Sequence, residues 1–310
     1  MSKHLFGLVA THHGTAANNR GETEGNITTL QKLLWRGEVH TTVSAEAIRY
    51  AIRWYWHRAG LADKLNRKTS DKAESHEWVD AEFKEWEKHL DDDVLGFMSA
   101  KAGKEEGNDE ETGKGKKKVR GTCDKRRARL EVTRAISLTP FTGDITFNAA
   151  SIGATPSASS TGKDPVPYGT EVHATRYQYG FALTPEELAD KRRVFDVLDA
   201  IVNLSAVAGN HARFLFDFSP ESIVLRWTDD FAPRMLYAFR HAGDGGLCVP
   251  DIVARTAAGD ILPEELFIGG PVAADTDVTG LMGKDAYLVP GVKDAVEEVK
   301  KRICADLKLS

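Results

Sequence analysis

Three side chains that can carry positive charge recur at intervals of four residues: Arg49, Arg53 and His57. On an α-helix this interval places them on one face, roughly 6 Å apart from one to the next. Successive phosphates of an extended single strand have a similar separation, so the row predicts a ladder of contacts to a nucleic-acid backbone. A solvated helix face is the simpler alternative, and these residues alone favour it.

The segment before this row is rich in hydrogen-bond donors and short of bulky side chains. Asn18, Asn19 and Arg20 lie close to Gly25 and Asn26. Loops of this composition let backbone N–H groups approach an anion closely. Together with the helical row, the loop shifts the prediction towards an anion-binding region.

Two H-x-T motifs offer a different chemistry. His40-Thr41-Thr42 and His173-Ala174-Thr175 each lie beside apolar residues, and two such motifs could supply the paired acid and base of a phosphodiesterase. The first motif runs directly into Ser44, a predicted helix cap, so we expect it at a helix entrance and not within a strand. This position disfavours the phosphodiesterase, which stays the rival enzyme prediction.

Asp91-Asp92-Asp93 is an acidic run that could ligate Mg²⁺, since two or three carboxylates can hold the cation together with a phosphate. A solvated turn that closes a helix is the alternative, and we favour it. The three cysteines, Cys123, Cys248 and Cys304, are few, widely spaced and odd in number. They predict ordinary thiols, not a disulfide framework or a zinc site. No metal or cofactor is therefore expected.

The composition is that of a globular protein with one large domain or two small ones. Among 310 residues, 41% are hydrophobic and 28% are charged. No apolar run approaches the length of a membrane span, and no signal peptide is visible. We therefore expect a cytoplasmic protein that does not contact membranes.

Charge is unevenly distributed along the chain, although the net charge is only -5. Residues 71–93 hold ten acids against three lysines, whereas residues 114–134 hold ten basic residues against Asp124 and Glu131. Such segregation suits a protein that holds nucleic acid on one face or stacks on copies of itself, and two solvated loops are the alternative. The basic cluster also suggests a DNA-binding regulator, although no helix-turn-helix or basic zipper pattern accompanies it.

The hydrophobic pattern predicts the elements that position these residues. A strand is expected over residues 4–11, and a helix is expected from Ser44 onwards. The helix should turn four residues to the core: Ile48, Ala51, Ile52 and Tyr55. Residues 62–113 look inserted, with a helix around Trp78, Phe83 and Trp86 and then a low-complexity run.

Further strands and helices follow the insertion. Strands are expected at residues 130–138, from 143, from 171, and at 209–218 and 222–230, with helices from Thr184 and over the last 18 residues or so. The long Gly-, Ser- and Pro-rich loop at 148–170 joins two of the strands and could project as a hairpin. This order predicts an α+β sandwich of the ferredoxin-like kind used by RRM modules. Because an RRM aromatic signature is lacking, backbone capture by loops and a helix is the better expectation.

Several linked motifs resemble one family. NNRGETEGN and SAEAIRYAIR near the start are followed by DDDVLGFM, EVHATRYQYGFAL, GNHARFLFDFSPESIVLRWTDD and Pro233-Arg234. Together they are similar to the seventh family of CRISPR-associated proteins in its DevR branch. The resemblance implies a non-catalytic crRNA-binding subunit that oligomerises along the guide RNA as the backbone of the type I-B Cascade complex in antiviral defence.

The resemblance also implies an architecture and a set of contacts. It implies an RRM-like palm from residues 1–61 and 119–310, an inserted finger region at 62–118, and a thumb at 148–170. The implied RNA-binding residues are Asn18, Asn19, Arg20, Asn26, Ser44, Arg49, Arg53, Asn210, His211 and Arg213. The implied thumb residues include Ile152, Thr155, Pro156, Lys163 and Pro167. The implied partners are crRNA, target DNA through the guide, other copies of the chain and other Cascade subunits.

Overall fold

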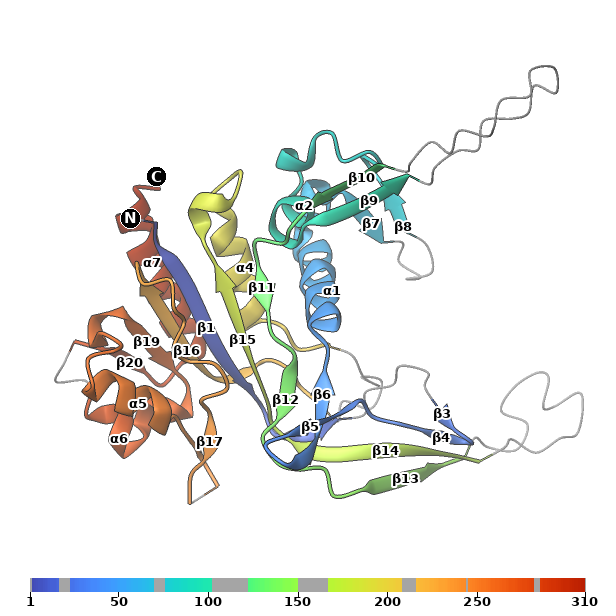
Figure 1. The fold of residues 1–310 in the computed structure, drawn as a ribbon, viewed down its shortest axis with the longest axis vertical. Helices are drawn as coiled ribbons and strands as arrows, with labels where there is room; N and C mark the ends of the chain where they lie inside the picture. Colours follow the sequence, from blue (N-terminus) through green and yellow to red (C-terminus); the bar gives the residue numbers. More distant parts are fainter. Residues whose placement is uncertain are drawn as a thin grey trace, which may run out of the picture.

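A computed structural model describes most of the chain (Figure 1). The described residues are 2–16, 23–69, 76–101, 122–149, 167–207, 216–243, 245–281 and 285–309. They form a mixed α+β protein in which the sheets are mostly antiparallel. Within these ranges, no helix combines the length and the apolar character that crossing a membrane requires.

The centre of the fold is a nine-stranded sheet with the order β20-β19-β16-β1-β15-β12-β6-β5, to which β11 adds by pairing with β15. Its first half along the chain comprises β1 (His4–Thr11), β5 (Lys32–Trp35), β6 (Glu38–Val43), β11 (Glu131–Val132) and β12 (Ala135–Ser137). Its second half comprises β15 (Tyr177–Leu183), β16 (Pro220–Thr228), β19 (Leu266–Gly269) and β20 (Tyr287–Val289). Within this sheet, β19 and β20 are the only described neighbours that pair in parallel.

Both faces of the sheet are covered, which is why every residue of β1 is buried. Leu5 and Val9 face a core built with α1 (Ala45–Trp56), α4 (Arg193–Val202) and α7 (Val292–Leu307). Phe6 and Leu8 face a second core, built with residues 235–281, which include α5 (Pro250–Ala257) and α6 (Thr276–Thr279). The predictions of a central strand at 4–11, a helix after Ser44 and a C-terminal amphipathic helix are confirmed.

A small unit is inserted after α1 and lies at the top right of Figure 1. It contains β7 (Arg67–Thr69), β8 (His76–Trp78), α2 (Leu90–Leu95), β9 (Phe97–Lys101) and β10 (Thr122–Arg126). The predicted helix around Trp78, Phe83 and Trp86 is wrong: Trp78 ends a strand and only a 3₁₀ turn follows at Trp86–Lys88. Phe83 has a φ of 56°, which a right-handed helix excludes, and its ring stacks on Phe97 instead.

A second sheet projects at the lower right of Figure 1. It pairs β13 (Asp144–Asn148) with β14 (Tyr168–Thr175), and β14 pairs further with β4 (Ile27–Thr28) and β2 (Gly14–Ala16), while β3 (Thr23–Glu24) pairs with β4. The predicted strands on either side of the 148–170 loop are confirmed. The strand expected from Glu171 is interrupted at Arg176, so that its first part belongs to this sheet and its second part, β15, to the central sheet.

The helix predicted to begin at Thr184 begins nine residues later, at Arg193. Pro185–Glu187 forms only a 3₁₀ turn, and the Thr184 side chain makes no cap. Its hydroxyl instead lies 2.7 Å from Nδ1 of His4 on β1, so a tertiary contact replaces the expected capping bond. Of the predicted strands at 209–218 and 222–230, the second is β16, and most of the first lies outside the described residues.

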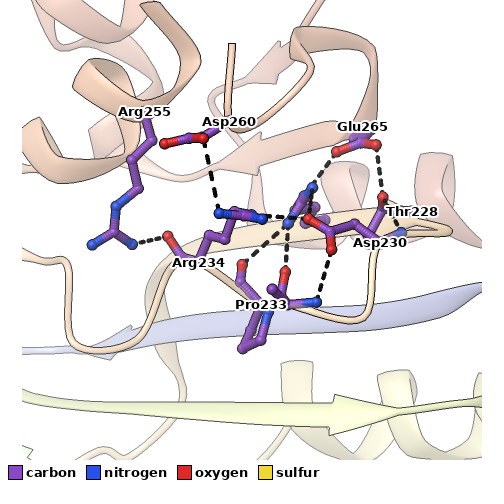
Figure 2. Close-up of polar contacts among 9 residues, drawn as sticks. Thr228, Asp230, Pro233, Arg234, Arg255, Asp260 and Glu265 are labelled. Atoms are coloured by element: carbon purple, nitrogen blue, oxygen red, sulfur yellow. Dashed lines mark hydrogen bonds and ion pairs between the residues drawn. The ribbon is translucent and has the colours of Figure 1, made fainter. Parts of the chain in front are cut away.

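A polar cluster that includes Asp230, Arg234 and Glu265 fixes the chain after β16 (Figure 2), and a buried arginine joins its members. Arg226 donates from Nε to Glu265 at 2.7 Å and from Nη1 to the carbonyl of Ala232 at 2.7 Å. Its Nη2 lies 3.2 Å from Asp230, which also accepts from Arg234 at 2.9 Å. The charged groups of this cluster satisfy one another, so it explains the Pro233-Arg234 motif as a structural feature.

Candidate nucleic-acid interface

Helix α1 forms as the sequence predicts, with one face in the core and the other turned away from it. The Ser44 hydroxyl accepts a hydrogen bond from the Ala47 N–H at 3.2 Å, which caps the first turn. Ile48, Ala51 and Ile52 are buried as expected, Tyr55 is partly buried and packs against the core, and Trp56 is buried as well. The face turned away from this core carries two arginines of the predicted row, Arg49 and Arg53, and both are partly buried.

Both arginines reach the inserted unit. Arg49 donates from Nη2 to the carbonyl of Leu95. Arg53 lies 3.2 Å from Asp91, between Nε and Oδ2, and the carboxylate is fully buried. These contacts hold α2 against α1. The row is thus a structural joint as well as a line of positive charge.

A third arginine completes what we call the arginine cluster: Arg49, Arg53 and Arg67. Burial lowers the pKa of Arg49 and of Arg67, and the positive charge of Arg53 lowers both further. Arg53 is therefore close enough to repel the guanidinium groups of both Arg49 and Arg67. The Nε of Arg67 is buried and has no hydrogen-bond acceptor among the described residues. The cluster therefore has both excess charge and an unused donor.

The neighbouring carboxylates, Glu46 beside Arg49 and the adjacent Asp91 and Asp92, only partly compensate the three positive charges. Asp91 contacts Arg53 and accepts the backbone N–H groups of Asn66 and Arg67. Burial, and secondly the charge of Asp91, raise the pKa of Asp92 to about 7, so at neutral pH Asp92 carries only part of a negative charge. An excess of guanidinium charge beside exposed surface suits a bound anion such as a phosphate.

Two exposed aromatic side chains accompany the cluster. Tyr50 on α1 is 41% exposed and interacts electrostatically with Arg67. Trp78 on β8 is 43% exposed, and the Arg67 guanidinium lies 5.7 Å from its ring centre. Cations for the backbone and aromatic faces for the bases are the two components of sites that hold single-stranded nucleic acid. The arrangement is a candidate nucleic-acid interface.

Comparison with known proteins agrees with this interpretation. The family model described as "CRISPR-associated negative auto-regulator DevR/Csa2" matches residues 11–191, more than half of the chain. The chain belongs to the DevR/Csa2 family. The family resemblance seen in the sequence is thereby confirmed.

A relative and two solved structures extend the comparison. The "CRISPR-associated protein Cas7/Cst2/DevR" of Myxococcus xanthus (strain DK1622) is 50% identical over 300 residues, covering 94% of this chain and 93% of the relative. A chain of a "CRISPR RNA-guided surveillance complex" has a similar fold, with a TM-score of 0.57 at 12% identity over 98% of this chain and 99% of that one. A second, from a "CRISPR RNA-guided surveillance complex, pre-nicking", has a TM-score of 0.60 at 11% identity, with coverage of 97% and 99%.

The acidic run of this DevR/Csa2 protein is not the solvated turn that we favoured. Asp91, Asp92 and Asp93 are all buried in the first turn of α2. Asp93 binds two arginines from distant parts of the chain, Arg126 and Arg193, each at 2.5 Å. Arginine and amide partners make burial of the carboxylates possible. Among the described residues, no group of three or more His, Cys, Asp or Glu side chains could hold a metal ion.

The two H-x-T motifs come together, but in the protein interior. The Thr41 hydroxyl lies 2.7 Å from Nδ1 of His173, and the Thr139 hydroxyl lies 3.2 Å from its Nε2. His40 contacts the Ser137 carbonyl at 2.7 Å. Contrary to our expectation, the first motif lies within strand β6, which continues to Val43. Burial lowers the pKa of His173, which favours its neutral form.

This geometry suits a buried polar network better than an acid–base pair. His40 and His173 are both buried, and both ring nitrogens of His173 are already engaged by threonine hydroxyls. A phosphodiester could not reach these atoms without opening the sheet. The motifs therefore join β6 to β14 at the base of the projecting hairpin.

The other predicted site residues lie in several places. Asn26 is in the β3–β4 turn, where its carbonyl accepts the Gly169 N–H at 2.9 Å, beside the hairpin and not beside the arginine cluster. Pro167 is exposed directly before β14. The remaining residues lie outside the described ranges: Asn18, Asn19, Arg20, Ile152, Thr155, Pro156, Lys163, Asn210, His211 and Arg213.

Proposed function

We propose that this DevR/Csa2-family protein is a non-catalytic crRNA-binding subunit. Copies of it repeat along a guide RNA in the cytoplasm and form the backbone of a type I CRISPR effector, the Cascade complex, for antiviral defence. The observation that carries the proposal is the arginine cluster, which lies within the family-matched segment and has an excess of positive charge. The same role is supported by a relative named as a CRISPR-associated protein and by two structures of similar fold whose titles refer to an RNA-guided surveillance complex.

The arginine cluster and the predicted loops bind the sugar-phosphate chain of the guide. Arg49, Arg53 and Arg67 contact phosphates, while Tyr50 and Trp78 stack on bases or riboses. The predicted contacts from Asn18, Asn19, Arg20, Asn26, Ser44, Asn210, His211 and Arg213 belong to the same proposal. Target DNA is then recognised by base pairing with the guide and not by protein side chains.

An RRM-like palm, fingers and a thumb provide the framework of this function. Strands β16, β1, β15 and β12 are neighbours in that order, and α1 and α4 pack on one face, which supports the β-α-β-β-α-β plan of the palm. Residues 62–118 form the inserted fingers, although β9 pairs with β10 just beyond that boundary. Residues 148–170 form the thumb, which the antiparallel pair β13 and β14 carries.

Copurification tests the proposal. We expect nucleic acid extracted from the purified complex to be RNA of one discrete length with repeat-derived ends. A protein that purifies without nucleic acid and does not bind single-stranded RNA would contradict it.

The family description also contains the words "negative auto-regulator", which favours a DNA-binding regulator as the second candidate. Regulator and guide-binding subunit differ in their preferred ligand. Preferential binding to duplex DNA in the absence of any guide would support the regulator. If the protein binds duplex DNA no more strongly than single strands, the regulator is excluded.

A further inference from the structure

The inserted unit holds a second basic surface, separate from the arginine cluster. An open pocket of about 480 Å³ lies between β9, β10 and the turn that precedes α2. We call it the finger pocket. Its cationic and aromatic lining includes Lys84, Trp86, Lys125, Arg126, Arg127 and Arg129, with Asp124 as the one acid among the lining residues of the described chain.

Two buried donors in this lining have no acceptor in the part of the chain that the structure describes. The Nε atoms of Arg126 and Arg129 are both buried without a hydrogen-bond partner among the described residues. The Arg126 guanidinium is held in place, since it lies 3.8 Å from the ring centre of Trp86 and 2.5 Å from Asp93. A fixed guanidinium with an unsatisfied donor is a preorganised anion contact.

The other cations of the pocket are available to a ligand. Lys125 has no ion pair among the described residues. Arg127 and Arg129 pair with Glu131 and Glu187, but these glutamates are more than half exposed. Exposed pairs of this kind contribute little free energy, so a phosphate could displace either carboxylate.

An aromatic stack runs between the finger pocket and the arginine cluster. Trp78, beside Arg67, contacts Phe83 at 5.3 Å between ring centres, and Phe83 stacks on Phe97 at 4.2 Å. Phe83 and Phe97 both line the finger pocket. These aromatic rings lie between the two basic sites. The finger pocket is therefore a separate site, which can bind a different stretch of polyanion from the one at the arginine cluster.

We propose that the finger pocket binds phosphodiester groups of a nucleic acid outside the arginine cluster. The inference rests on the proposed function only in taking nucleic acid as the ligand. The phosphates could belong to a further segment of the guide RNA or to DNA brought to the complex. A phosphodiester group of either nucleic acid presents the same charge and the same tetrahedral shape to Lys125, Arg126 and Arg129.

The test uses the complex as purified, with the double variant Lys125→Glu and Arg127→Glu. Both side chains are exposed, so the fold should persist. The matched control reverses two exposed cations of α7, Lys301→Glu and Arg302→Glu. Guide content is measured from the nucleic acid extracted per chain, and binding of a duplex DNA without complementarity is measured over a range of salt concentrations.

We expect the finger variant to bind one of the two nucleic acids at least about tenfold more weakly than the control. The slope of log affinity against log salt concentration should also decrease in magnitude by about 1 to 2, because one or two phosphate contacts are lost. A weakened duplex with unchanged guide content assigns the phosphates to DNA, whereas reduced guide content assigns them to the guide. Either result supports the pocket.

Unchanged guide content together with unchanged duplex affinity and slope would overturn the inference. A wild-type protein that carries no guide would instead count against the proposed function. In that case the duplex comparison still decides the finger pocket, so the two failures remain distinguishable.

Discussion

Three adjacent aspartates illustrate how strongly one side chain's role depends on its surroundings. The Asp91 carboxylate accepts hydrogen bonds from Arg53 and from two backbone N–H groups. The Asp93 carboxylate forms ion pairs with Arg126 and Arg193. Within the described ranges, the Asp92 carboxyl accepts a hydrogen bond only from the Asn66 amide, at 2.7 Å. Paired carboxylates can be buried as anions, whereas a buried carboxyl without a cation holds its proton to higher pH.

The raised pKa of Asp92 predicts a pH dependence of stability. Burial shifts this pKa from 3.8 to about 7, so between these values the folded state binds more protons than the unfolded state. Stability therefore falls as pH rises from about 4 to 7. Asp92→Asn removes this loss, and we expect it to gain about 1 to 2 kcal/mol over wild type between pH 5 and pH 8, because water screens part of the full shift.

Urea unfolding of wild type and Asp92→Asn at the two pH values measures this effect. Taking the difference between the proteins cancels the contribution of every titrating group that does not interact with Asp92. If that difference is the same at pH 5 and pH 8, Asp92 is already ionised in the folded protein and the account of this residue is wrong.

Arg67 gives the cleanest residue-scale test of RNA binding, since its Nε is free of any acceptor among the described residues. We expect Arg67→Gln to weaken binding of single-stranded RNA about tenfold. The slope of log affinity against log salt should shrink by about 0.7, the value for one phosphate contact on a single strand. Lys301→Gln, on exposed α7, is the control. Equal slopes for the two variants would exclude Arg67 from the interface.

At the scale of elements, the local hydrophobic pattern was sufficient to predict those elements whose position is determined by burial in the core. The apolar run of β1, with apolar residues on both faces, and the apolar stripe of α1 led to their bounds within a residue or two, because β1 is buried on both faces and α1 on one. The row of Arg49 and Arg53 could likewise be found from helical spacing. Arg67 could not, because it reaches the same surface from a strand 14 residues further along the chain.

The errors come from tertiary contacts that override local signals. Thr184-Pro185-Glu186-Glu187 has the residue types of a helix start, but Thr184 bonds to His4 and the Ala189 N–H bonds to Asp93. Likewise, three adjacent aspartates are typical of a solvated turn. Here Asp91 and Asp93 are buried because arginines from distant parts of the chain pair with them. Such pairings between residues about 30 to 180 positions apart leave no periodic trace in the sequence.

Asp93 is the group that ties the inserted unit to the central fold. It connects α2 to Arg126 on β10 and to Arg193 at the start of α4. Asp93→Asn leaves two arginines without their carboxylate, and we expect it to cost about 3 to 5 kcal/mol of stability in denaturant unfolding. Asp124→Asn, an exposed aspartate on β10, should cost less than about 0.5 kcal/mol. Similar losses for both variants would contradict this role.

At the scale of the whole molecule, the inserted unit and the β13–β14 hairpin project on the same side of the central sheet, with α1 between them (Figure 1). The hairpin exposes Ile145 and Phe147, the latter by 76%. Large apolar side chains so exposed on a projecting hairpin are suited to pack on another molecule. In the proposed assembly that molecule is the adjoining copy.

Phe147→Glu should therefore weaken assembly along RNA and leave the folded monomer intact. Burying one phenylalanine stabilises a contact by about 2 kcal/mol, so we expect at least about a tenfold loss in the affinity of one copy for the next. The control is Phe231→Glu, which changes a phenylalanine that is 80% exposed beside His4. Gel-shift titration on a long RNA distinguishes the two, and equal cooperativity would exclude the hairpin from the interface.

The most direct test of the account is the mass of the assembly on synthetic RNAs of increasing length. If each copy holds one segment of the guide, the protein mass should rise in steps of one 34.1 kDa chain as the RNA is extended. Native mass spectrometry measures these steps. A single copy bound at every length, or a protein stoichiometry independent of length, would contradict the central claim.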